Sequence, residues 1–172
     1  MNHLRYLFLF LVFLLLALPA NAQRVKDYSS SVGLRVGTPT AVSYKGYFNQ
    51  RHAAEVYVGY RSYDVSRYIS VNAAYLSHQQ IESLRGLKYY VGAGPGVRRW
   101  SYDFSESGAT VVTASAYVGL EYDIPRIPVS VSADWVPTYF FGRDGGSGTF
   151  GYDLGGLGVR YRFAGAYDYD DE

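Results

Sequence analysis

The sequence predicts an all-β protein: a single eight-stranded, antiparallel, up-and-down transmembrane β-barrel. Three observations indicate this fold, namely segments of about ten residues that alternate apolar and polar side chains, aromatic residues near the segment ends, and an export signal. The clearest segment is Val111–Tyr122, whose even positions are all apolar while its odd positions include Thr113 and Glu121. Side chains alternate across a strand, so this segment has one oily face and one polar face.

The first 22 residues are predicted to be a cleaved signal peptide. Arg5 gives a basic start, and Leu7–Leu18 is an unbroken apolar run of twelve residues. The small residues Ala20 and Ala22 then mark a cleavage site before Gln23. The alternative, an N-terminal membrane anchor, is disfavoured because a spanning helix needs about 20 apolar residues.

The composition of the mature chain argues against several classes of protein. Removal of the signal leaves 172 − 22 = 150 residues, which suits one domain. It removes one of the 16 Lys and Arg residues and none of the 15 Asp and Glu residues. The mature net charge is therefore 15 − 15 = 0, and we expect no nucleic-acid partner. The chain has no Cys, so disulfide bonds cannot supply stability.

Eight segments show the strand pattern, and they are predicted to form one domain over residues 23–163. Their connections are short, so neighbouring strands are expected to run antiparallel. A soluble β-sandwich also alternates, but only a barrel in a bilayer needs aromatic residues at the ends of its apolar face. The expected strands are Ser30–Gly37, Ala41–Phe48, Ala53–Arg61, Tyr68–His78, Leu87–Tyr102, Val111–Tyr122, Val129–Phe141 and Tyr152–Phe163.

The polar face of these strands carries many charged residues. An eight-stranded barrel has an interior just wide enough for side chains, and buried charges must be paired. We therefore predict a salt-bridge network that fills the lumen; a narrow anion-preferring pore is the alternative, because bases exceed acids. The expected inward charges are Arg35, Lys45, Arg61, Lys88, Arg98, Arg160, Arg162, Glu55, Glu121 and Asp134.

The opposite face is expected to contact lipid, with Leu120 and Val131 near the middle of the bilayer. If the N-terminus lies in the periplasm, the outward aromatic residues fall into two girdles. The segments Phe104–Thr110 and Gly142–Gly151 are then expected to be long outward loops. The periplasmic girdle comprises Phe48, Tyr75, Tyr89, Tyr122, Tyr161 and Phe163, and the other contains Tyr60 and Tyr139.

The last predicted strand resembles the closing strand of outer-membrane β-barrels. Gly155–Phe163 alternates apolar residues and ends in Phe, and in that family the barrel-assembly machinery recognises such a strand. The resemblance is to the small OmpA/OmpX-like barrels, and it implies the bacterial outer membrane as location, with its lipid bilayer and the assembly machinery as partners. One departure is the tail at 164–172, because the closing Phe is usually the last residue. Further segments similar to strands of this family are Gly33–Gly37, Gly86–Gly94, Val118–Tyr122 and Ile127–Trp135.

Candidate catalytic residues are few. Some small outer-membrane barrels are lipid-modifying enzymes that use Ser, His and an acid. After removal of the signal only His52 and His78 remain, and both are predicted at periplasmic turns. Ser77 precedes His78, but adjacent strand residues point to opposite faces, so the two cannot act as nucleophile and base. We predict no enzyme activity and no catalytic, cofactor-binding or metal-binding residue.

Two further patterns are given structural interpretations. Gly92, Gly94 and Gly96 lack the strand-to-helix context of a phosphate loop, and they are predicted to make room inside the lumen. The acidic run Asp168–Glu172 lacks the spaced ligands of a calcium loop, so 164–172 is predicted to be a flexible solvated tail.

The sequence thus predicts a monomeric integral outer-membrane protein with a structural or surface-interaction role and a plugged lumen. Three alternatives stay open: the narrow anion-preferring pore, a lipid-directed outer-membrane enzyme, and a soluble periplasmic β-sandwich that binds a ligand.

Overall fold

The computed structural model describes residues 28–49, 51–102, 105–142, 148–152 and 154–164. The predicted signal peptide at 1–22 and most of the predicted tail, 165–172, lie outside these ranges. The part of the chain that is described contains no helix long and apolar enough to cross a membrane. The strands are β1 (Tyr28–Thr38), β2 (Thr40–Tyr47), β3 (His52–Ser62), β4 (Ser66–Gln80), β5 (Leu87–Tyr102), β6 (Ser105–Asp123), β7 (Val129–Trp135), β8 (Thr138–Phe140), β9 (Thr149–Gly151) and β10 (Gly155–Ala164).

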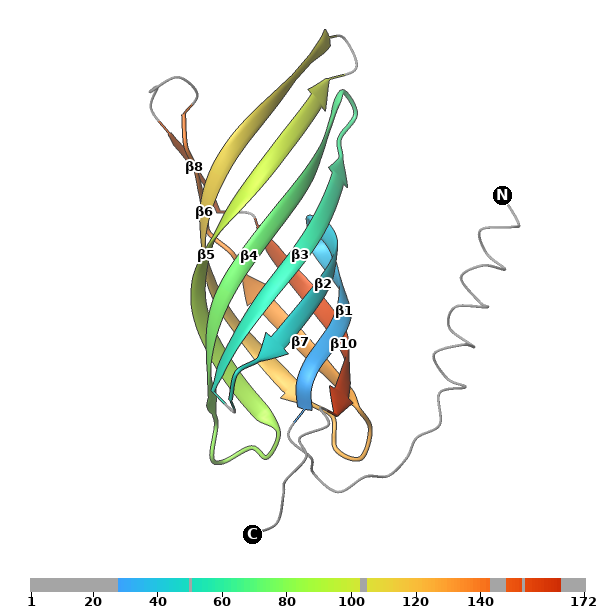
Figure 1. Ribbon diagram of the computed structural model, residues 1–172, viewed down its shortest axis with the longest axis vertical. Coiled ribbons are helices and arrows are strands. Elements are labelled where there is room, and N and C mark those ends of the chain that lie inside the picture. The colour runs from blue at the N-terminus through green and yellow to red at the C-terminus, as the bar shows by residue number, and fades with distance from the viewer. Residues whose placement is uncertain (1–27, 50, 103–104, 143–147, 153, 165–172) are drawn as a thin grey trace, which may run out of the picture.

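The strands form one closed antiparallel barrel (Figure 1). Each strand from β1 to β6 pairs with the next along the chain, and β7 pairs with β6 and β10. The ring closes where β1 pairs with β10, from Tyr28 opposite Ala164 to Thr38 opposite Gly155. β8 continues the wall beside β6, and β9 pairs with β8. The ten strands therefore fill eight positions, and the predicted eight-stranded up-and-down barrel is confirmed.

The last two predicted strands are each interrupted. Val129–Phe141 is divided into β7 and β8 at Val136 and Pro137, because proline has no backbone N–H to give to the ladder. The interruption stays attached to the wall, since the Val136 N–H donates to the Leu154 carbonyl at 2.8 Å. Tyr152–Phe163 is likewise divided, and β10 begins at Gly155, whose φ of 138° suits only glycine.

The predicted loop Phe104–Thr110 is wrong, because most of it is strand. β6 begins at Ser105, which pairs with Tyr102, so β5 and β6 form a long hairpin. In the second predicted loop, Gly142–Gly151, the last three residues are β9, and 143–147 lie outside the described residues. The β3–β4 and β5–β6 hairpins extend well beyond the β1–β2 hairpin, at the end opposite the start of β1 and the end of β10 (Figure 1).

The alternation predicted from the sequence is present in the strands. In β6, Val112, Val118 and Leu120 are exposed on the outer face, whereas Thr113 and Glu121 are buried inside. A closed barrel with an apolar outer face is suited to a lipid bilayer. The alternative of a soluble periplasmic β-sandwich is therefore wrong.

The predicted depth of Leu120 needs correction. Leu120 does face outward, but it lies opposite Tyr89 of the girdle at the barrel end where the chain begins and finishes. It also stands only three residues before the end of β6 at Asp123. Leu120 is therefore nearer to the membrane interface than to the middle of the bilayer.

The glycines of β5 stand where any side chain would collide with the neighbouring strands. A Cβ atom on Gly94 would meet the backbone carbonyl oxygen of Ala73 on β4. A Cβ atom on Gly96 would meet the side chains of Asn72 and Thr113. This supports the prediction that these glycines make room inside the barrel, and it excludes a phosphate-loop geometry because all three lie within strand β5.

Candidate functional site: the barrel lumen

The candidate site is the lumen of the barrel, which the inward-facing side chains line. All the charged residues that were predicted to face inward do face the lumen. Seven of them are buried: Arg35, Lys45, Glu55, Arg98, Glu121, Arg160 and Arg162. Arg61 and Lys88 are half-buried, and the side chain of Asp134 is 3% exposed.

The centre of the lumen is an ionic cluster around two glutamates from different walls. Lys45 lies between them, with its Nζ 2.8 Å from Oε2 of Glu121 and 3.6 Å from Oε2 of Glu55. The guanidinium of Arg160 donates to Oε1 of Glu55 at 2.7 Å. The Ser130 hydroxyl donates to the second oxygen of Glu121 at 2.9 Å. Each carboxylate thus has a cation and hydrogen-bond donors, which buried charges require.

A second group of contacts extends this cluster to Asp134 on β7. Arg35 donates from Nη2 to Oδ1 of Asp134 at 2.6 Å, and the Tyr90 hydroxyl donates to Oδ2 at 2.8 Å. The Arg35 guanidinium also lies 3.9 Å from Glu55 and 4.7 Å from the centre of the Tyr57 ring. One network therefore joins β1, β3, β5 and β7 across the lumen.

His78 belongs to this network, although it was predicted at a periplasmic turn, as the last residue of the strand Tyr68–His78. β4 continues to Gln80, so His78 is a strand residue, and its side chain is buried inside the barrel. Its Nε2 lies 3.3 Å from Oε2 of Glu121, and its ring lies 5.2 Å from that of Tyr90. The alternation of the strand could have shown that His78 faces inward. It lies an even number of positions from Ser70, which faces inward, and such residues share one face of a strand. The predicted opposite orientation of Ser77 is confirmed by its place on the outer side of β4.

A smaller ionic cluster lies toward the terminal end of the barrel. Asp123 Oδ2 is 2.8 Å from Nζ of Lys88 and 3.0 Å from Nη1 of Arg162. The predicted strand ended at Tyr122, but Asp123 is the last residue of β6 and its carboxylate turns inward. Two of the predicted bases are therefore paired with one acid outside the predicted set.

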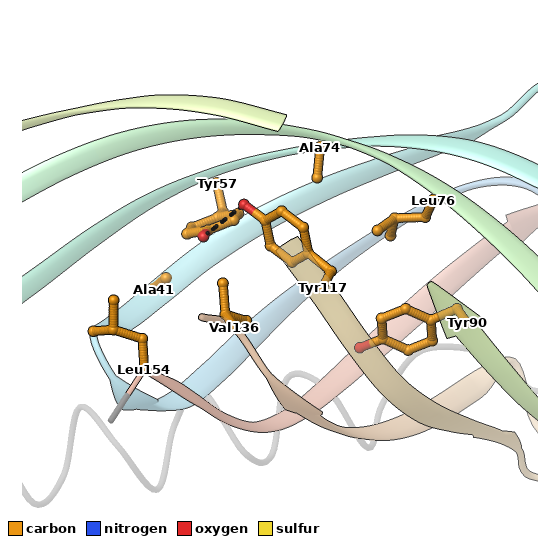
Figure 2. Packing of buried hydrophobic residues seen from close by; sticks show 8 residues of the cluster. All are labelled: Ala41, Tyr57, Ala74, Leu76, Tyr90, Tyr117, Val136 and Leu154. Carbon is orange, nitrogen blue, oxygen red and sulfur yellow. Dashed lines mark hydrogen bonds between the residues drawn. The ribbon is translucent and has the colours of Figure 1, made fainter. Parts of the chain in front are cut away.

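An apolar layer that includes Tyr57 and Tyr117 lies farther from the terminal end of the barrel than Glu55 and Glu121 on the same strands. Tyr57 and Tyr117 approach from β3 and β6, and their hydroxyls are 3.0 Å apart (Figure 2). Val136 and Leu154, from the interruptions of the last two strands, pack into the same cluster. The cavity beside this layer has a volume of about 10 Å³, room for about one water molecule.

Arginine side chains and aromatic rings occupy the mouth of the barrel on the far side of the apolar layer. The guanidinium carbon of Arg98 lies 4.0 Å from the centre of the Tyr68 ring and 4.6 Å from that of Phe140. Arg61 donates to the Gly37 carbonyl oxygen at 3.2 Å. These contacts are the cation–π and charge-assisted kind that stabilise arginine away from bulk water.

The contacts of His78 differ from those of a serine-type catalytic site. Hydrolysis of the serine type needs a nucleophile within hydrogen-bond reach of a histidine. In the described residues His78 contacts a carboxylate and aromatic rings, while Ser130 donates to that same carboxylate instead. No group of three or more His, Cys, Asp or Glu side chains with metal-binding geometry occurs among the residues that the structure describes.

The comparisons with known proteins found matches among solved structures only. No protein-family model matches the sequence, and no curated protein matches it. Among solved structures, the N-terminal β-barrel domain of Pseudomonas aeruginosa OprF is similar, with a TM-score of 0.59 and 17% identity over 78% of this chain and 95% of that one. Neisserial surface protein A (NspA) is similar with a TM-score of 0.51 and 16% identity, over 78% of this chain and 93% of that one.

The fold is that of a small outer-membrane β-barrel. The resemblance seen in the sequence is thereby confirmed at the level of the fold. The fold and the apolar outer face are those of a barrel that spans a membrane, as the predicted outer-membrane location requires.

Proposed function

We propose that the protein is a non-enzymatic barrel with a structural or surface-interaction role, and that its lumen is closed to solutes. The observation that carries this proposal is the pairing of the buried lumen charges, with both oxygens of Glu121 engaged by Lys45 and Ser130. A network of this kind costs free energy to open, because separated charges would remain buried without partners.

The apolar layer supports the same conclusion. Ions cross a narrow lumen only where water or polar groups replace their hydration shell. Between the ionic cluster and the mouth, an ion would have to pass Tyr57, Tyr117, Val136 and Leu154, which pack together.

The orientation of the barrel in the membrane is inferred from a general asymmetry of such barrels, in which the short turns face the periplasm. We propose that the terminal end faces the periplasm, so that the β3–β4, β5–β6 and β8–β9 hairpins face outward. These protruding hairpins are the surface available to partners outside the cell. The barrel-assembly machinery and the bilayer are the proposed partners during and after insertion, and the chain is proposed to act as a monomer.

Electrical recording tests the closed lumen. The purified barrel, inserted into a planar bilayer, is expected to pass no steady ionic current. The second candidate is the narrow anion-preferring pore, which is favoured by the seven described lumen bases against Glu55, Glu121, Asp123 and Asp134. Discrete current steps with anion preference would establish that pore and reject the closed lumen.

A further inference from the structure

Each of the three described turns at the terminal end of the barrel carries an exposed arginine. These turns join β2 to β3, β4 to β5 and β6 to β7 (Figure 1). Their arginines are Arg51, Arg85 and Arg126. No ion pair of the described residues includes any of the three. Glu82 is the only acid among the described residues of these turns, so this rim of the barrel is positively charged.

The arginines stand just beyond the aromatic girdle of the same end. Arg51 is three residues before Ala54, the residue opposite Tyr75 of the girdle. Tyr122, also of the girdle, is followed by Arg126 four residues later. An aromatic girdle marks the membrane–water interface, where hydrocarbon gives way to headgroups. The guanidinium groups of these turns therefore lie at the level of the lipid phosphates.

Each arginine shares its turn with a large apolar side chain that is also exposed. The pairs are Phe48 with Arg51, Leu84 with Arg85 and Ile127 with Arg126, and their apolar members are 66%, 56% and 41% exposed. A bilayer accommodates such pairs, because the apolar group enters the acyl region while the cation remains among the headgroups. The same combination in all three turns indicates contact with lipid and not with water alone.

The backbone holds two of these arginines in defined turns. The side-chain oxygen of Asn49 accepts from the backbone N–H of Arg51 at 2.9 Å and from that of His52 at 2.8 Å. Arg126 has a φ of 70°, a left-handed conformation that glycine adopts more readily, so arginine is present there at a conformational cost. Ordered turns reduce the entropy lost when a lipid binds.

We propose that Arg51, Arg85 and Arg126 bind the phosphate groups of anionic phospholipids around the terminal end of the barrel. Guanidinium groups donate in pairs to phosphate oxygens. A zwitterionic headgroup adds an ammonium group, which these arginines repel and which has only Glu82 as a described acid in the turns. Dissolved phosphate would gain nothing from the exposed apolar side chains, and this favours a lipid. The inference rests on the proposed orientation, which makes this leaflet the periplasmic one.

Native mass spectrometry of the folded mature protein in detergent tests the proposal. The probes are phosphatidylglycerol and phosphatidylcholine, with inorganic phosphate as a competitor. Each arginine near an anionic surface contributes about fivefold, so wild type should retain phosphatidylglycerol at least about tenfold better than phosphatidylcholine. Excess inorganic phosphate should not displace it. The variant Arg51→Gln/Arg85→Gln/Arg126→Gln should lose the preference, whereas Arg51→Lys/Arg85→Lys/Arg126→Lys should keep part of it, because lysine keeps the charge but cannot donate as a fork.

The matched control is Glu82→Gln, which changes the charge of the same turns in the opposite direction. It should leave the preference intact or strengthen it. The variant Leu84→Ser/Ile127→Ser should retain both lipids less well, since it removes two exposed apolar side chains beside the arginines. Unchanged retention of both lipids by this variant would show that the turns bind a phosphate without its lipid, and would overturn the proposal.

Three further results would also overturn it. They are equal retention of the two lipids by wild type, an unchanged preference in the glutamine variant, and displacement by inorganic phosphate. A preference that appears only when 165–172 are removed would show that the acidic tail occupies the arginines instead. Boiled and unboiled samples are compared by electrophoresis in parallel. A wild-type shift without lipid preference rejects this site alone, and a missing wild-type shift rejects the membrane barrel itself.

Discussion

Lys45 and Glu121 face each other across the barrel, with Nζ and Oε2 2.8 Å apart and both side chains inaccessible to solvent. β2 and β6 are four positions apart in a ring of eight, so this ion pair joins opposite walls. Such a contact forms only when the ring is closed and the register of every strand between the two is correct. The pair is therefore a sensitive reporter of the complete barrel.

Replacement of Glu121 should destabilise the barrel strongly. In Glu121→Gln, Lys45 keeps only the longer contact with Glu55, and His78 loses its carboxylate neighbour. Loss of one partner from a buried pair typically costs about 3–5 kcal/mol, and the free energy of unfolding in urea should fall by that amount. Glu82→Gln, in the exposed turn after β4, is the control and should change stability by less than about 0.5 kcal/mol. Equal effects of the two changes would show that the network contributes nothing.

The period of two predicted the barrel and the inward charges, since each depends only on local alternation. It did not predict the Pro137 interruption or the length of β6, because these depend on which strand a segment meets. It also ended two strands early, at His78 and at Tyr122, since strand ends are set by pairing with a neighbour and not by composition. The partners of each charge depend on the stagger between distant strands, and the local alternation does not specify that stagger.

Gly94 should tolerate no side chain. In Gly94→Ala, the new methyl group would meet the carbonyl oxygen and carbonyl carbon of Ala73, and backbone atoms cannot move aside as a flexible side chain can. Overpacking of this kind costs about 1–3 kcal/mol, measured as a lower urea midpoint. Gly46→Ala is the control, because the nearest atom to its new Cβ would be in the Tyr44 ring at 3.8 Å. If the two alanine variants unfold at the same urea concentration, the close approach of β4 and β5 at Gly94 is not real.

The mature protein should behave as a membrane barrel in electrophoresis. Its outer face exposes Leu34, Val58 and Val159 at about half of their full area, and such a surface requires lipid or detergent. Unboiled samples in mild detergent should migrate differently from boiled ones, and circular dichroism should show β-structure. A protein that remains folded and monomeric in buffer without detergent would disprove the membrane location.

The lipid-facing surface should penalise charge according to depth. Val56 lies outward on β3, midway between His52 at the terminal end and Tyr60 in the outer girdle. Val56→Arg should therefore reduce the free energy of unfolding in lipid vesicles by about 2–4 kcal/mol. Ser62→Arg is on the same face of the same strand but beyond the girdle, so its side chain reaches water and should cost no more than about 1 kcal/mol. A cost for Ser62→Arg as large as that for Val56→Arg would show that the apolar belt extends farther up β3 than Tyr60.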